Sequence, residues 1–192
     1  MTEAPTIAGQ RPAAIGPGRL VLVVGPSGAG KDTLLALAQV ACAGDAGVVF
    51  PRRVVTREAS ASEDNAQVSG EEFQRMLSRG EFAMHWQAHG HRYGLPRTID
   101  DDVRAGRTLV ANVSRTVVEA MRGAYADVTV VEVTAPPDVL ARRLLGRARR
   151  SDGELADRLR RTVDGAAPDV TINNVGRAEH HARELVRIIK GD

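Results

Sequence analysis

The sequence predicts an α/β protein in which a parallel sheet is flanked by helices, and two observations lead to this fold class. First, apolar runs of strand length alternate with helical patterns along the 192 residues, as in proteins built from strand–helix–strand units. Second, the run RLVLVV at residues 19–24 is apolar without alternation, which indicates a strand covered on both faces. Strands of this kind belong in a parallel sheet between two layers of helices.

The stretch GPSGAGKDT at residues 25–33 follows that strand directly and precedes a helical pattern. Its spacing matches the phosphate-binding loop G-x-x-x-x-G-K-[ST], except that Asp32 replaces the hydroxyl residue and Thr33 follows one position later. Glycines let successive N–H groups point inward at a phosphate, and Lys31 adds a point charge. A tight turn with an incidental lysine is disfavoured because strand, spacing and helix agree. We therefore expect a P-loop NTPase domain that binds its nucleotide with these residues: Gly25, Pro26, Ser27, Gly28, Ala29, Gly30, Lys31, Asp32 and Thr33.

Asp32 stands where such loops carry a ligand of the metal, and two interpretations remain open. In the first, the carboxylate binds Mg²⁺, holds it through water or orients the attacking group. In the second, Asp32 is only an acidic residue of the first helical turn, where negative charge is favoured. Thr33 would then supply the hydroxyl contact.

The elements after the loop follow from periodicity, capping and turn residues. The spacing of Ser69 and Glu72 is that of a capping box, and a glycine interrupts the alternating stretch EFAMHWQAHGHRYG. The predicted order up to this point is a helix over 31–43, a strand over 48–55 interrupted by Pro51, an irregular segment over 56–68, a helix over 70–78 and a hairpin over 81–94. Next come a helix after Pro96, a strand over 108–114, a helix, a strand over 128–134, a helix from 136–137, a helix from about 153, a strand over 169–174 and a terminal helix.

Composition limits the class of protein. The net charge is only +2 and the aromatic content only 3%, which argues against a general nucleic-acid binder. The single cysteine, Cys42, reads as a small buried residue and suggests a reducing compartment. No apolar run is long enough for a membrane span, and residues 1–18 lack the apolar core of a signal peptide. We expect a loose tail over residues 1–18, one domain over 19–192, and a cytoplasmic location.

The segment LARRLLGRARRSDGELADRLRR, residues 140–161, contains eight arginines. In an arginine-rich chain, most of these residues are expected on a solvated helical face. Arg147, Arg149 and Arg158 lie where helical periodicity lapses or just beyond it, so they can form a lid over a bound triphosphate. Guanidinium groups stabilise the charge that spreads over a transferred phosphoryl group, and a closed lid excludes water. We place this lid at about residues 146–157.

Several segments in order, namely GPSGAGKD, VTR, GEEF, HWQAHGHRYG, VANVSR and the arginine-rich segment, resemble the ribose 1,5-bisphosphate phosphokinase family. The resemblance extends from about residue 19 to residue 190. It implies a nucleoside-monophosphate-kinase-like fold, similar to guanylate kinase, with an acceptor-binding insertion at about residues 56–95 and a lid. The implied reaction, in phosphonate catabolism, transfers the γ-phosphoryl group of ATP to ribose 1,5-bisphosphate. Its product is 5-phosphoribosyl 1-diphosphate (PRPP).

The chain departs from the guanylate kinase pattern at the positions that contact GMP. A carboxylate that accepts guanine N–H groups is absent, and a site without it leaves these donors poorly paired. The replacements are Ser60 and Asn65 for phosphate-binding residues, Gln87 for the guanine-reading glutamate, and Asn112 and Ser114 for an acidic pair. Guanine recognition is therefore weakened, while Arg57 and Tyr93 remain for a phosphate.

The predicted site residues divide into two groups. Lys31, Asp32, Arg147, Arg149 and Arg158 are assigned to catalysis with ATP and Mg²⁺, and Asp32 is the metal candidate. Acceptor binding is assigned to Arg57, Tyr93 and Arg115, with His91 and Arg92 as further candidates. The attacking phosphate oxygen is already ionised, so no strong general base is needed. His85, His89 and His91 alternate along one predicted strand, which suggests a metal site. No carboxylate or Cys stands at ligand spacing, however, so acceptor binding by His91 or a structural role is favoured. Trp86 is expected in the core.

Two alternatives stay open. One is a guanylate kinase or another nucleoside monophosphate kinase. The other is a non-catalytic guanylate-kinase-like module that binds protein partners, which the retained Lys31 and lid arginines disfavour. The expected partner is a small-molecule substrate, not nucleic acid or a membrane. The sequence does not decide between a monomer and a homo-oligomer.

Overall fold

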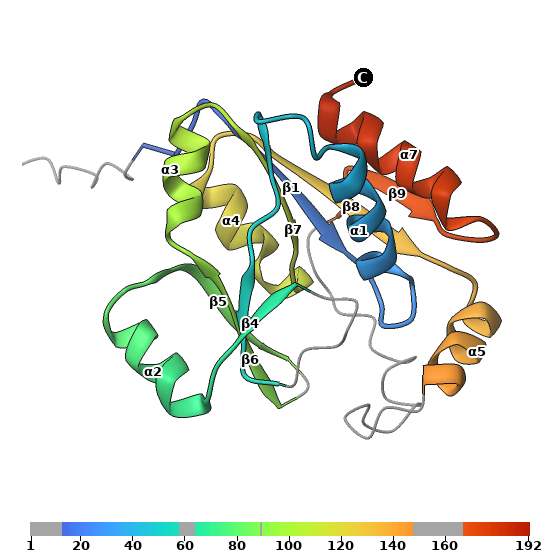
Figure 1. Ribbon diagram of the computed structural model, residues 1–192, viewed down its shortest axis with the longest axis horizontal. Helices are drawn as coiled ribbons and strands as arrows, with labels where there is room; N and C mark the ends of the chain where they lie inside the picture. The colour runs from blue at the N-terminus through green and yellow to red at the C-terminus, as the bar shows by residue number, and fades with distance from the viewer. Residues whose placement is uncertain (1–12, 58–63, 89, 148–166) are drawn as a thin grey trace, which may run out of the picture.

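A computed structural model describes residues 13–57, 64–88, 90–147 and 167–192. Its centre is a parallel five-stranded sheet with the strand order β2-β7-β1-β8-β9 (Figure 1). The strands are β2 Val48–Val49, β7 Thr108–Asn112, β1 Arg19–Val24, β8 Val128–Thr134 and β9 Val170–Asn173. All four neighbouring pairs run parallel. The predicted fold class is therefore confirmed, and the predicted strand over residues 19–24 coincides with β1.

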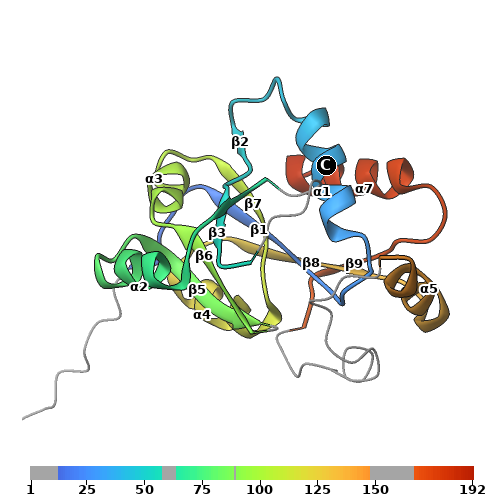
Figure 2. The same ribbon diagram turned by 60° about the horizontal axis from the view of Figure 1, so that its bottom comes forward.

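Helices cover both faces of this sheet, and each face has its own core. On one side lie α1 (Lys31–Ala41), α5 (Pro137–Arg147) and α7 (Ala178–Lys190); on the other lie α3 (Thr98–Arg104), a 3₁₀ turn η1 (Arg115–Val117) and α4 (Val118–Ala124) (Figure 2). The central strand serves both cores because it is apolar throughout: Leu20 and Leu22 pack in one cluster, Val21 and Val23 in the other. This double burial explains the absence of alternation in its sequence.

A second, four-stranded sheet with the order β4-β3-β6-β5 stands beside the large one. Its strands are β4 Asn65–Gln67, β3 Arg53–Val55, β6 His91–Pro96 and β5 Phe82–Ala88, and α2 (Gly70–Ser78) precedes β5. The predicted hairpin appears as antiparallel β5 and β6. The predicted capping box is present in part: the Ser69 hydroxyl accepts the Glu72 N–H at 3.0 Å, while the Glu72 carboxylate pairs with arginines.

Two predictions in this region were wrong. The strand expected over residues 48–55 is two strands, and they belong to different sheets: β2 pairs with β7, whereas β3 pairs with β4 and β6. Proline cannot donate a ladder hydrogen bond, so the chain turns out of the large sheet at Pro51. The segment expected to be irregular contains β4, which pairs with β3.

The ends of several elements also differ from expectation. The loose tail predicted over residues 1–18 includes a residue that is tied to the fold: Ile15 exchanges backbone hydrogen bonds of 2.8 and 2.9 Å with Ala124 and Ala126. Helix α1 ends two residues before Ala43, and Cys42, which caps it, is 4% exposed. The helix predicted from about residue 153 lies outside the described residues. Within the described part of the chain, no helix has both the length and the apolar character needed to cross a membrane.

Candidate phosphoryl-transfer site

The phosphate loop joins β1 to α1 at the carboxyl edge of the large sheet. Its glycines Gly25, Gly28 and Gly30 have φ angles of 140°, 83° and 89°, which residues with a Cβ rarely adopt. At Gly25 a Cβ atom would also lie 2.0 Å from the carbonyl oxygen of Val133 in β8. The sequence requirement for glycine is therefore both conformational and steric.

Lys31 and Asp32 form the start of α1, and both face the space beside the loop. The Lys31 ammonium donates to the carbonyl oxygens of Gly25 at 2.7 Å and Pro26 at 3.0 Å. Asp32 lines two adjoining pockets. Thr33 is exposed and lines neither of them. The geometry thus favours Asp32 over Thr33 as the residue that meets a ligand at the loop.

Two residues that the sequence analysis did not single out support the loop from behind. The Arg143 guanidinium of α5 donates to the carbonyl oxygens of Gly28 and Ala29, both at 3.4 Å, and to Asn174 O at 2.9 Å. The Asn174 amide donates to Ala29 O at 2.7 Å, and the residue is 3% exposed. Asn174 follows the end of β9 at the same sheet edge as the loop. A polar residue at this position after a predicted strand is the sequence signal from which its role at the loop could have been predicted. The sequence analysis placed Arg143 among the arginines expected on a solvated helical face, so its contact with the loop was not predicted.

A pocket of about 320 Å³ opens between the phosphate loop, the small sheet and the end of β7. Its lining combines four cationic side chains, Lys31, Arg53, Arg57 and Arg115, with a single carboxylate, Asp32. The remaining polar side chains in the lining are neutral: Ser27, Gln87, Tyr93, Asn112, Ser114 and Thr116. Such a lining suits an acceptor with several negative charges.

The three main acceptor candidates reach this pocket from different elements. Arg57 follows β3, Tyr93 lies in β6 and Arg115 begins η1. The Tyr93 ring stacks on Trp86, with centroids 5.6 Å apart and planes 8° apart, so Trp86 is buried as expected and also forms one wall. Arg115 forms an ion pair with Glu132 of β8. That pair fixes the guanidinium at the edge of the sheet.

Other candidates are placed elsewhere. Arg92 is not part of the pocket lining, because neighbouring residues of a strand point to opposite faces; its guanidinium donates to Gln74 of α2 at 2.8 Å, while Tyr93 faces the pocket. His91 is half-buried and is not part of the pocket lining. Among the described residues, no three or more His, Cys, Asp or Glu side chains are grouped so that they could hold a metal. The Arg147 side chain and all of Arg149, Arg158 and Ser60 lie outside what the structure describes.

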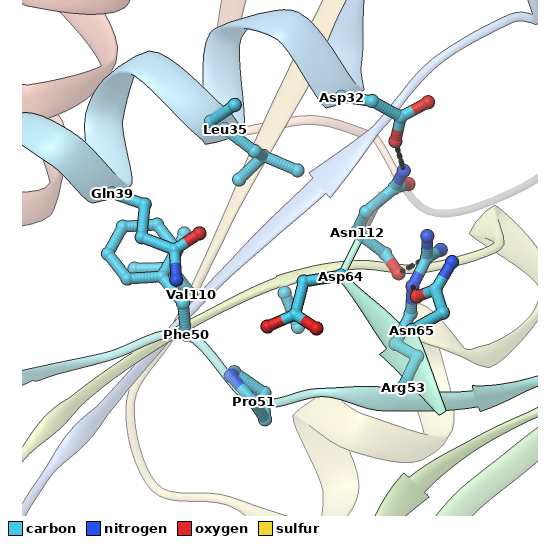
Figure 3. Close-up of a pocket in the computed structure, with 12 residues that line it drawn as sticks. Asp32, Leu35, Gln39, Phe50, Pro51, Arg53, Asp64, Asn65, Val110 and Asn112 are labelled. Carbon is cyan, nitrogen blue, oxygen red and sulfur yellow. Dashed lines mark hydrogen bonds between the residues drawn. The ribbon is translucent and has the colours of Figure 1, made fainter. Parts of the chain in front are cut away.

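A second, smaller pocket lies under α1, and a chain of hydrogen bonds separates it from the first (Figure 3). The Asn112 amide donates to the Asp32 carboxylate at 2.9 Å. Arg53 donates to the Asn112 carbonyl oxygen at 3.1 Å and to the Asn65 side chain at 3.3 Å. These hydrogen bonds connect the phosphate loop, the end of β7 and the small sheet. Asn65 and Asn112, noted in the sequence only as departures, thus belong to one network.

Comparison with known proteins gives close relatives over the whole chain, although no family model matches it. The ribose 1,5-bisphosphate phosphokinase PhnN of Bradyrhizobium diazoefficiens is 62% identical over 194 residues, covering 100% of the chain and 98% of that protein. The protein of the same name from Rhodopseudomonas palustris is 61% identical over 184 residues, covering 96% and 94%. Among solved structures, guanylate kinase from Anaplasma phagocytophilum superposes with a TM-score of 0.63 at 25% identity, covering 91% of the chain and 85% of that structure.

Proposed function

The chain belongs to the ribose 1,5-bisphosphate phosphokinase family, and on that premise we propose that it phosphorylates ribose 1,5-bisphosphate to 5-phosphoribosyl 1-diphosphate with ATP as donor. The observation that carries the proposal is the pocket lining of four cations and one carboxylate beside the phosphate loop. An acceptor with two phosphates and no base needs several cationic groups and no group that reads a base. A small-molecule kinase of this kind works where ATP is abundant, and we place it in the cytoplasm.

The proposed chemistry is a direct phosphoryl transfer. An oxygen of the acceptor's 1-phosphate forms a bond to the γ-phosphorus of ATP, while the bond from that phosphorus to the β–γ bridging oxygen breaks and ADP leaves. The attacking oxygen is already ionised, so no proton has to be removed. Catalysis then rests on positioning and on stabilising the charge of the transferred group.

Each residue has a role in this proposal. Lys31 leaves its two loop carbonyls and binds the terminal phosphates of ATP, while the loop N–H groups surround the phosphates. Arg57 and Tyr93 hold the acceptor from the small sheet, and Arg115 holds it from the large one. Arg147, Arg149 and Arg158 supply the lid.

Mg²⁺ suits this donor set, because it binds few protein carboxylates and completes its shell with water and substrate phosphates. Asp32 is the residue proposed to hold it, from a position that lines both pockets. When bound, the ion neutralises charge on the terminal phosphates. Asp32 contributes the charge that attracts the ion and the oxygen that fixes its place.

The test is a panel of acceptors with the purified chain, ATP and Mg²⁺. Ribose 1,5-bisphosphate, ribose 5-phosphate, GMP and AMP are offered in parallel. Consumption of ATP measures turnover of each acceptor, and a phosphoribosyltransferase that consumes 5-phosphoribosyl 1-diphosphate identifies that product. We expect turnover of the bisphosphate and poor turnover of GMP. Rapid phosphorylation of GMP without turnover of the bisphosphate would support a guanylate kinase and reject the proposal.

A further inference from the structure

Asp32 and Asn112 meet where the two pockets adjoin, and their contact is not that of a helix cap. Helix α1 begins after Gly30, whose position carries no side-chain cap. The Asp32 carboxylate accepts a hydrogen bond from Asn112 at the end of β7, 80 residues away in sequence. Figure 3 shows the two side chains pointing toward each other, and both residues line both pockets. The geometry thus weakens the interpretation of Asp32 as a mere acidic residue of the first turn.

These two positions have known chemical roles in P-loop NTPases. There the loop supplies a neutral hydroxyl and the end of a neighbouring strand supplies a carboxylate, and the two hold Mg²⁺ together. In this chain the types are reversed: the loop supplies the carboxylate Asp32 and the strand end supplies the neutral amide Asn112. The pair still carries one negative charge. It also still offers only oxygen ligands toward a cation, because the Asn112 nitrogen is turned to Asp32.

We propose that Asp32 and Asn112 form an exchanged metal-holding pair, in which the carboxylate has moved from the strand to the loop. The inference rests on the proposed function, since it concerns the Mg²⁺ that accompanies ATP. Asn112 orients Asp32 through its amide N–H, and its amide oxygen would serve as the neutral ligand of the pair.

The strand side of this pair is held in place from two directions. Asn112 is paired with Val23 in the sheet register, one residue before the phosphate-loop strand ends. Its carbonyl oxygen accepts a hydrogen bond from Arg53 at 3.1 Å, and Arg53 also binds the side chain of Asn65, which is 7% exposed. A metal ligand needs such support, because neighbouring groups that orient ligands strongly affect metal affinity.

The test exchanges the two residues and measures metal-dependent nucleotide binding without any acceptor. The variants are Asp32→Ser, Asn112→Asp and the double variant Asp32→Ser/Asn112→Asp, which restores the usual arrangement. Calorimetry gives the dissociation constant of ATP in EDTA and that of Mg–ATP, and their ratio is the quantity compared. Electron paramagnetic resonance of Mn²⁺ with ATP provides an independent measure of metal binding.

We expect Asp32→Ser to lower this ratio by about tenfold or more. Asn112→Asp should raise the ratio, because two adjacent carboxylates repel metal-free ATP and attract the metal complex. The double variant should return the ratio to within about threefold of the unsubstituted chain, well above the ratio of Asp32→Ser alone. If Asp32→Ser does not fold, Asp32→Asn makes the same comparison with the shape of the side chain kept.

A purely structural hydrogen bond would lower thermal stability in the single variants and leave the ratio unchanged, which would overturn the inference. So would a double variant whose ratio stays as low as that of Asp32→Ser. Nucleotide binding by the unsubstituted chain distinguishes a failure of the proposed function from a failure of the exchanged pair alone. If it binds neither ATP nor Mg–ATP, the proposed function fails; if it binds both and the exchange has no effect, only the exchanged pair fails.

Discussion

Replacement of Lys31 directly tests whether the phosphate loop catalyses phosphoryl transfer, and the chain offers a matched control residue. It contains only two lysines, Lys31 in the phosphate loop and Lys190 at the end of α7. Lys31→Met keeps the aliphatic stem and removes the charge. A unit charge about 4 Å from another contributes about 4 kcal/mol at an effective dielectric constant of about 20. Because about 1.36 kcal/mol corresponds to a tenfold rate change, the expected loss in kcat is about 10³-fold.

The fold should survive this change. Lys31 loses two hydrogen bonds to loop carbonyls, of 2.7 and 3.0 Å, each worth about 1 kcal/mol net. For a chain of this length that lowers Tm by roughly 4–8 °C. Phosphoryl transfer is measured with the coupled assay, and folding by thermal melting followed by circular dichroism. Lys190→Met should retain the full rate. A Lys31→Met protein that is folded and within a few-fold of the normal rate would refute the assignment of the loop.

Three further predictions concern other parts of the structure. Arg57→Ala should raise KM for ribose 1,5-bisphosphate by at least tenfold, because a charged hydrogen bond of about 1.5–3 kcal/mol is lost, and should leave the ATP dissociation constant unchanged. Gly25→Ala should lower Tm and abolish ATP binding, since its Cβ would lie 2.0 Å from a carbonyl oxygen, whereas Gly44→Ala, with open space around it, should do neither. The buried Tyr125 hydroxyl donates to Asp100 at 2.6 Å, and burial, followed by this carboxylate, raises the pKa of Tyr125. The stability that this shift contributes is present below about pH 10 and is lost as the pH rises further. In urea denaturation, Tyr125→Phe should therefore have a lower free energy of unfolding at neutral pH than the unsubstituted chain. This free energy should also fall less steeply above about pH 10 in the variant.

Local sequence signals were sufficient where an element depends on its own residues. The phosphate loop was predicted from its glycine spacing, α2 from its Ser69 cap, and the hairpin from a glycine between alternating strands. The apolar run of residues 19–24 predicted β1 at its observed bounds because both of its faces are buried. In each case the physical cause lies within a few residues of its effect.

Other features depend on partners far along the chain. Strand β4 has three residues and no periodicity of its own, and only its pairing with β3 makes it a strand. Arg143 and Asn174 reach the loop from 114 and 145 residues away; only the position of Asn174 after a strand end hints at its role, and nothing near Arg143 in sequence marks its contact. Arg92 is different: alternation within β6 already placed it opposite Tyr93, so its position outside the pocket lining could have been predicted from the strand.

The division of the chain between two sheets has a consequence for how this enzyme's selectivity can change. The chain leaves the large sheet after β2 and rejoins it at β7; between them it forms the small sheet and α2, with Arg57 and Tyr93, before α3 returns to cover the large sheet. Neither the loop nor the pairing of the five parallel strands depends on hydrogen bonds made within the small sheet. The small sheet and α2 therefore form a segment whose exchange would present a different acceptor to the same donor machinery. A replacement would have to reproduce the contact of Arg53 with Asn112 and the packing of Val55, Trp86, Tyr93 and Leu95 in the core shared with the large sheet.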